Sequence, residues 1–161
     1  MSDASILYDE DIVAWSKQQA EALRSAARTG SNHLLDWENL AEEIEGLGIS
    51  QRSALGSHIM RIIQHFTRLE FSPAIEPRNG WRRSIRLARV QAQRRLEFSP
   101  SLRPELRRIV EDETRRGIEY AIADLEEHGE IDEVDAAALR RATYTEEQIL
   151  GDWFPPEPEK D

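Results

Sequence analysis

The chain contains no cysteine among its 161 residues. Disulfide bonds, thiol nucleophiles and cysteine-ligated metal centres are therefore excluded. Lysine is also scarce: Lys17 and Lys160 stand beside 19 arginines. Because guanidinium groups suit bidentate pairing with carboxylates and phosphates, the basic chemistry of this chain is almost entirely that of arginine.

Long apolar runs are missing as well. No stretch approaches the roughly 18 residues that a membrane-spanning helix needs. The first residues, MSDASILYDEDI, have neither the basic start nor the apolar centre of a signal peptide. With 39% hydrophobic and 32% charged residues, the composition is that of a folded, water-exposed protein. We expect a cytoplasmic protein with one domain over residues 1–161, an ordered body over about 8–154 and a frayed tail over 157–161.

The common catalytic motifs are absent too. The sequence has no Gly-x-Ser-x-Gly nucleophile elbow, no phosphate-binding Gly-x-x-x-x-Gly-Lys loop and no Gly-x-Gly-x-x-Gly fingerprint. We therefore assign no catalytic residue, no metal ligand and no cofactor, and we favour a protein that is not an enzyme.

What the chain does have is a segregation of charge. Residues 78–108 carry ten arginines and two acids, for a local charge of +8, whereas the remainder carries −18 and the whole chain −10. Such a strongly acidic remainder argues weakly against nucleic-acid binding by the protein as a whole.

Apolar residues recur at intervals of three and four, with no sustained alternation of period two. This pattern predicts an all-α bundle of about four main helices with a short C-terminal helical tail. The main helices are expected to begin near Asp9, Asp36, Trp81 and Ser101, the last two ending near Leu96 and Glu127. Short helical segments are expected over 130–141 and from Thr145, which starts a capping box. The large side chains expected to anchor the core or tail are Trp15, Trp37, Trp81 and Trp153.

The second predicted helix is unusually long, and its apolar phase barely slips at Gly46–Gly48. A continuous helix there would span about 50 Å, whereas a domain of this size has a radius of gyration of about 15 Å. Three alternatives remain: a kink near Gly46–Gly48, an elongated molecule, or pairing with a second copy.

Several stretches resemble, in order, a bacterial family named Domain of Unknown Function 29. The most specific is LDWENLAEEIEGLG at residues 35–48. The others are YDED at 8–11 with Trp15, WRRSI at 81–85, SPSLR at 99–103 and YTEEQIL at 144–150. The resemblance implies an all-helical fold and no particular activity. Ile12-Val13 departs from the family, which usually has an aromatic pair at that point.

The first part of the second predicted helix carries a row of acidic side chains. Glu38, Glu42 and Glu45 share one side of a helix and offer carboxylates to a divalent cation. Helical two-metal sites usually add a Glu-x-x-His pair, which this chain lacks. The simpler interpretation is a solvated face, or one that pairs with arginines of the third predicted helix.

The histidines are a weak metal signal. His58 and His65 lie seven residues apart, about 10 Å along a helix, too far to share one ion. We expect both either to flank the core and form local hydrogen bonds or to face water. We expect His33 to lie in a loop, and His128 to lie at a helix end where its charge is favourable.

The arginine-rich helix carries the main functional hypothesis. Arg82, Arg86 and Arg89 form a stripe at i, i+4 and i+7 that either pairs within the fold, binds an acidic protein or tracks phosphates, with Trp81 placed to stack on a base. The leading prediction is a non-catalytic protein–protein interaction module, or a self-associating homodimer, with these three arginines binding the partner. Alternatives are a nucleic-acid-binding protein using this helix, and a metal-dependent hydrolase using Glu38, Glu42 and His65. No membrane partner is expected.

Overall fold

The computed structural model describes residues 3–30 and 35–156, so the predictions for His33 and for the tail at 157–161 lie outside the described residues. The described residues form seven α-helices and no strand, and four of the helices are long, which confirms the all-α prediction. The elements are α1 (Asp3–Glu10), α2 (Ile12–Arg28), α3 (Trp37–Phe71), α4 (Arg78–Phe98), the 3-10 helix η1 (Pro100–Glu105), α5 (Leu106–Glu127), α6 (Glu133–Leu139) and α7 (Glu146–Leu150).

Two compact units share these elements. The first comprises Met1–Ala54 and Arg94–Pro104, and the second comprises Leu55–Gln93 and Glu105–Asp161, so the border falls inside α3 and α4. The single domain over 1–161 stays a prediction. Within the described ranges, no helix combines the length and apolar character needed to cross a bilayer.

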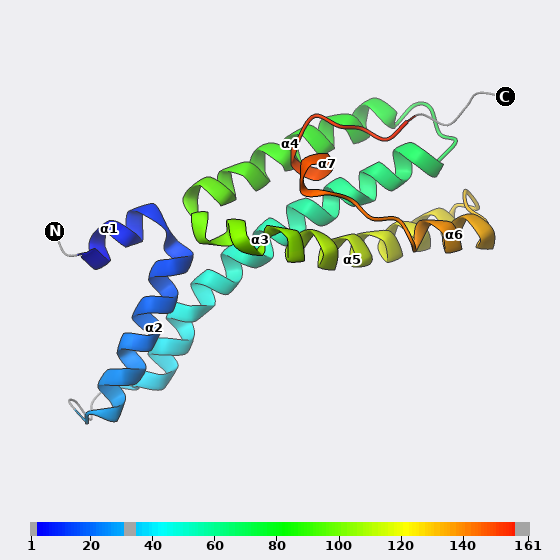
Figure 1. Ribbon diagram of the computed structural model, residues 1–161. Helices are drawn as coiled ribbons and strands as arrows, with labels where there is room; N and C mark the ends of the chain where they lie inside the picture. Colours follow the sequence, from blue (N-terminus) through cyan, green and yellow to red (C-terminus); the bar gives the residue numbers. More distant parts are fainter. Residues whose placement is uncertain (1–2, 31–34, 157–161) are drawn as a thin grey trace. The chain divides into compact units, whose positions relative to one another are not determined.

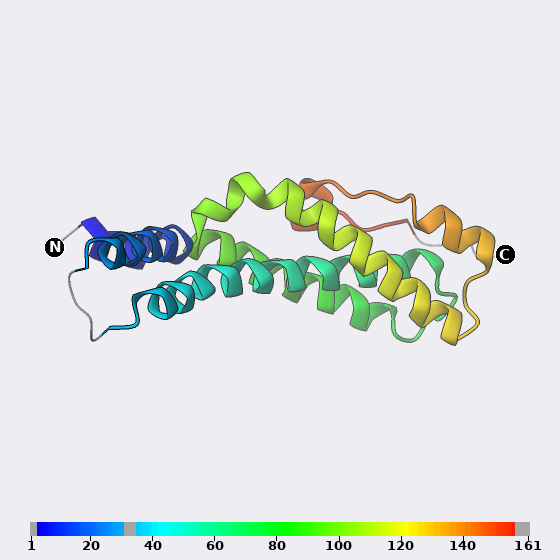
Figure 2. The same cartoon turned by 90° about the horizontal axis from the view of Figure 1, so that it is seen from below.

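In the first unit, α2 and the beginning of α3 run antiparallel side by side (Figures 1 and 2). We call residues 12–28 and 37–54 the α2–α3 hairpin. Its buried seam contains small side chains, among them Ser16, Ala20 and Ala41. A Cβ atom built on Gly48 would lie 2.6 Å from the Ser16 Oγ atom, so glycine permits the close approach of the two helices here. The helical structure of α3 is unbroken at Gly46–Gly48.

The start of the first predicted helix is wrong, because Asp11 divides it into α1 and α2. Asp11 has extended backbone angles, and its side chain accepts a hydrogen bond of 2.9 Å from the Ala14 amide. The same carboxylate accepts bonds of 2.6 Å from the Ser101 amide and 2.9 Å from its hydroxyl. Asp11 therefore caps α2 and also fixes η1 to it.

The predicted helix start at Ser101 is also wrong, since η1 occupies that stretch and α5 begins at Leu106. Pro104 disfavours α-helical backbone angles at the residue before it, and Asp11 already occupies the donors of Ser101. Other helix boundaries are set by contacts within a few residues, and their predicted positions agree better with the structure. Asp36 caps α3 through the Asn39 amide at 3.3 Å, and Thr145 forms the expected capping box with Gln148.

The second unit has its core between the later part of α3, α4 and α5 (Figure 2). Phe66 is fully buried in this unit, together with isoleucines and leucines of all three helices. The four tryptophans are only half-buried, as is common for so large a side chain. Trp153 packs edge-on against Phe66 at 5.1 Å between ring centroids, so it anchors the C-terminal segment as expected.

Candidate functional site

Helix α4 carries the arginine stripe, and one member of the stripe points into the fold. Arg89 is 6% exposed. Its Nε atom donates to the Ile149 carbonyl at 2.8 Å, and Nη2 donates to the carbonyls of Gln148 at 2.8 Å and Trp153 at 2.5 Å. These carbonyls lie at and beyond the end of α7, where helical partners run out, so Arg89 completes the hydrogen bonding of the C-terminal segment.

Aromatic rings complete the surroundings of Arg89. Its guanidinium carbon lies 4.9 Å from the ring centroid of Phe154 and 5.5 Å from that of Phe66. Burial lowers the pKa of Arg89, the carboxylate of Asp152 opposes that effect, and neighbouring Arg86 adds to it. The role of Arg89 seen in the structure is to hold residues 148–153 against α4.

The other two arginines of the stripe lie differently. Arg82 is half-buried, whereas Arg86 is exposed with its guanidinium carbon 5.6 Å from the Phe154 ring centroid. The three side chains therefore do not form one exposed surface. The partner-binding role of Arg82, Arg86 and Arg89 stays a prediction, and Arg89 has a demonstrable role inside the fold.

The outward side of α4 also exposes apolar side chains. Leu87 is 57% exposed and Val90 50%, and the exposed Arg83 and Arg86 accompany them. We call Arg83, Arg86, Leu87 and Val90 the α4 face. Beside it lies a groove of about 430 Å³ whose lining includes Arg86, Val90 and Phe154. Sequence reasoning found the arginines and missed the apolar members. The sequence feature that indicates them is a pair of large apolar residues, three positions apart, that does not belong to the buried apolar side of the helix.

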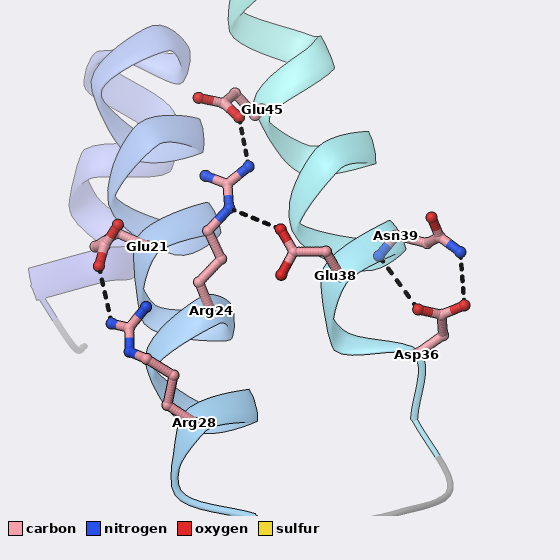
Figure 3. Close-up of polar contacts among 7 residues, drawn as sticks. All are labelled: Glu21, Arg24, Arg28, Asp36, Glu38, Asn39 and Glu45. Carbon is pink, nitrogen blue, oxygen red and sulfur yellow. Dashed lines mark hydrogen bonds and ion pairs between the residues drawn. The ribbon is translucent and has the colours of Figure 1, made fainter.

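The acidic row has a partner in the first unit (Figure 3). Arg24 of α2 lies between two carboxylates of α3, with Nη2 2.7 Å from Glu45 and Nε 3.3 Å from Glu38. These hydrogen bonds raise the pKa of Arg24, the bond to Glu45 most. Two members of the row therefore pair with α2, whereas the prediction was a solvated face or pairing with arginines of the third predicted helix.

The predicted metal ligands do not converge. Glu38 and Glu42 belong to the first unit, whereas His65 belongs to the second. Over residues 3–30 and 35–156, no cluster of three or more carboxylate or imidazole side chains is arranged to hold an ion. The hydrolase hypothesis based on Glu38, Glu42 and His65 therefore has no ligand set in the described fold.

His65 itself is half-buried, and its Nδ1 atom has no hydrogen-bond partner. Burial lowers its pKa to about 4, with further lowering by the charges of Arg68 and Arg61. It is consequently neutral at physiological pH. His128, at the end of α5, has a raised pKa because its ring bonds the Asp124 carbonyl, as its helix-end position predicts.

A second cavity, of about 330 Å³, lies between α5 and residues 140–144. Its lining mixes both charge signs, and Arg140 is already paired with Glu119 at 3.0 Å. Tyr144 lines it too. Burial raises the pKa of Tyr144 to about 12, and the charge of Glu70 contributes. A phenol with so high a pKa remains protonated at physiological pH, so Tyr144 is not an activated base.

Comparisons with known proteins agree with this fold. Residues 7–154 match the family described as "Domain of unknown function DUF29". A crystal structure of an α-helical protein of unknown function from Rhodospirillum rubrum superposes with a TM-score of 0.71 at 24% identity, covering 92% of this chain and 91% of that one. At that identity the likeness concerns the fold alone. No curated protein matches. Because the family match covers most of its length, the chain belongs to the DUF29 family, whose function is unknown.

Proposed function

We propose that the protein is a non-catalytic protein–protein interaction module whose α4 face binds an acidic partner. The observation that carries the proposal is the exposure of Leu87 and Val90, at 57% and 50%, between arginines that are exposed as well. Burying apolar area contributes about 25 cal/mol per Å². A partner that covers these two half-exposed aliphatic side chains would therefore stabilise the complex. Interface centres are apolar and enriched in arginine.

The chemistry of the α4 face specifies the partner. Arg83 and Arg86 lie three positions apart and suit carboxylates, whereas Leu87 and Val90 suit an apolar strip. A helix or segment with leucine-like side chains bordered by Asp or Glu satisfies both requirements. The local charge of +8 over residues 78–108 would accelerate the encounter with such a segment, since opposite potentials steer association.

The test is a comparison of two charge reversals. The double variant Arg83→Glu/Arg86→Glu alters the α4 face, and Arg107→Glu/Arg108→Glu makes the same change of charge on α5, where both side chains are over 80% exposed. Each protein is immobilised and incubated with lysate of the source organism. We expect at least one protein to be retained by the wild type and the α5 variant, and lost from the α4 variant. Identical retention by all three would contradict the proposal.

Arg89 is left out of this variant for a structural reason. A carboxylate at position 89 would face the carbonyls of residues 148, 149 and 153, and would release the C-terminal segment from α4. Any loss of binding would then report misfolding.

Nucleic-acid binding is the second candidate, because exposed arginines on one helix side can track phosphates. It predicts a gel shift with DNA or RNA that weakens steeply between low and moderate salt. The net charge of −10 opposes it. A shift abolished by the α4 variant alone would favour this candidate over the protein partner.

A further inference from the structure

The cavity of about 330 Å³ between α5 and residues 140–144 lies within the second unit. Its α5 wall consists of residues at helical intervals of three and four, which share one side of the helix. Thr114, only 6% exposed, and the buried Ile118 form the floor of this wall. The charged members of the wall are exposed and form its rim, namely Glu111, Arg115 and Glu119. The cavity therefore combines a buried floor with a charged rim.

The opposite wall is a chain segment that is held at both of its ends. At one end, the amides of Arg141 and Ala142 donate to carbonyls at the end of α6, at 3.0 and 2.9 Å. At the other end, Thr145 forms the capping box of α7. Because both ends are fixed, residues 140–144 are a preformed wall, as is usual for sites that bind small molecules.

The floor contains a polar group whose hydrogen bonding is incomplete. The Thr114 Oγ1 atom is buried and has no hydrogen-bond partner among the described residues. A hydroxyl offers one donor and two acceptor positions, and burying it without a partner lowers stability because its bonds to water are lost. Valine has the same shape without this cost, so the stability of the fold does not explain the hydroxyl. A bound molecule that reaches the floor would supply the partner.

Both carboxylates that line the cavity already have partners. Glu119 accepts a hydrogen bond of 3.0 Å from Arg140, and Glu111 accepts one of 3.2 Å from Arg107. A cationic group of a ligand would have to compete with one of these arginines. The lining therefore disfavours a cation.

The remaining arginines of the lining are open to an anion. Arg141 forms no ion pair with any residue that the structure describes, and Arg115 approaches Asp112 at 3.9 Å, too far for a hydrogen bond. Neither Asp112 nor Glu70, whose charge acts on Tyr144, lines the cavity. Guanidinium groups bind carboxylates through paired N–H donors, so the rim suits an organic acid.

We propose that this cavity binds a small organic acid whose carboxylate meets Arg141 at the rim and whose hydroxyl meets Thr114 on the floor. Ile118 and the ring of Tyr144 line the cavity between these two points and suit an apolar body. At about 30 Å³ per water molecule of the liquid, the cavity has the volume of about eleven waters. The ligand is therefore limited to roughly ten to fifteen non-hydrogen atoms.

This inference goes beyond the proposed function and uses no residue of the α4 face. The variant Arg83→Glu/Arg86→Glu is expected to bind the acid as the wild type does. Loss of partner capture and loss of acid binding are therefore separate results.

Titrations of the full chain, followed by proton–nitrogen correlation spectra, test the inference with matched probes. The probe para-hydroxyphenylacetate carries a carboxylate, a ring and a hydroxyl, phenylacetate lacks the hydroxyl, and tyramine has an ammonium group in place of the carboxylate. We expect para-hydroxyphenylacetate to shift the amides of residues 111–119 and 140–144 with a dissociation constant of about 1 mM or lower. We expect tyramine to bind at least about tenfold more weakly. No saturable shift at these residues, or equal affinity for tyramine, would overturn the proposal.

Two variants test the two contacts separately. Thr114→Val keeps the shape of the side chain, and it should weaken para-hydroxyphenylacetate about fivefold while leaving phenylacetate within about twofold. Arg141→Gln should weaken both acids about tenfold. The control is Arg103→Gln, at an exposed arginine of η1 outside the lining, which should leave both affinities unchanged. Equal effects of Thr114→Val on the two acids, or unchanged affinity in Arg141→Gln, would contradict the proposed site.

Discussion

At Arg89, one side chain satisfies backbone groups that the sequence places 59 to 64 positions away. Its three hydrogen bonds end on the carbonyls of Gln148, Ile149 and Trp153. A bond from a charged donor contributes about 1.5–3 kcal/mol, and leaving buried carbonyls without a partner removes that contribution. Arg89 is therefore the residue that couples the C-terminal segment to α4.

We expect Arg89→Leu to lower the free energy of unfolding by about 3 kcal/mol, since several carbonyls lose their donor at once. Arg89→Lys should recover little, because an ammonium group lacks the planar fork that reaches three acceptors. Urea denaturation followed by circular dichroism measures both. The control is Arg86→Gln, an exposed site where the loss should stay below about 1 kcal/mol. Equal losses at positions 86 and 89 would refute the role given to Arg89.

His65 predicts a dependence of stability on pH. Its pKa is about 4 in the folded chain and 6.5 ordinarily, so between these values the unfolded chain binds more protons. The stability associated with neutral His65 is complete above pH 6.5 and is lost as pH falls towards 4. We expect the free energy of unfolding of the wild type to decrease more over this window than that of His65→Gln. Parallel curves for the two proteins would contradict the low pKa.

At the scale of elements, the apolar period and the local caps located much of the fold from sequence. Asp36 and Thr145 form their caps with amides three positions away, which a linear pattern can show. The capping role of Asp11 was not predicted, because the sequence alone does not distinguish an acid that caps a helix from an acid within its first turn. Its bond to Ser101 crosses 90 positions, and the Arg24–Glu45 pair joins two helices, so neither leaves a local pattern.

Two glycines in long helices should respond differently to alanine. A Cβ at Gly46 of α3 would meet nothing within 4 Å, whereas one at Gly117 of α5 would lie 3.1 Å from Ile63 Cγ2 and 3.3 Å from the Met60 carbonyl oxygen. Alanine in a helix interior is favoured over glycine by about 1 kcal/mol. We expect Gly46→Ala to gain about that amount, and Gly117→Ala to lose stability because α3 and α5 must separate. Thermal unfolding monitored by circular dichroism distinguishes them, and a gain at Gly117 equal to that at Gly46 would be inconsistent with close packing there.

At the scale of the whole molecule, local ion pairs form both within the acidic remainder of the chain and at the edge of the arginine-rich segment 78–108. Arg24 binds α3 carboxylates, Arg68 binds Asp124 at 2.8 Å, and Arg107 has Glu111 one helical turn away. The arginines of α4 divide between the fold and the surface, with Arg89 inside and Arg83 and Arg86 outside. Sequence reasoning found the arginine-rich helix but could not divide its members, because the distinction depends on the C-terminal segment packing against α4.

The most direct test of the interaction proposal is calorimetric titration of a captured partner into three proteins: the wild type, Arg83→Glu/Arg86→Glu and Arg107→Glu/Arg108→Glu. All three should first show equal helical content and melting temperature. We predict a loss of affinity of at least about tenfold for the α4 variant, equivalent to 1.4 kcal/mol, and a change below about twofold for the α5 control. Equal affinity for the wild type and the α4 variant would contradict the assignment of partner binding to the α4 face.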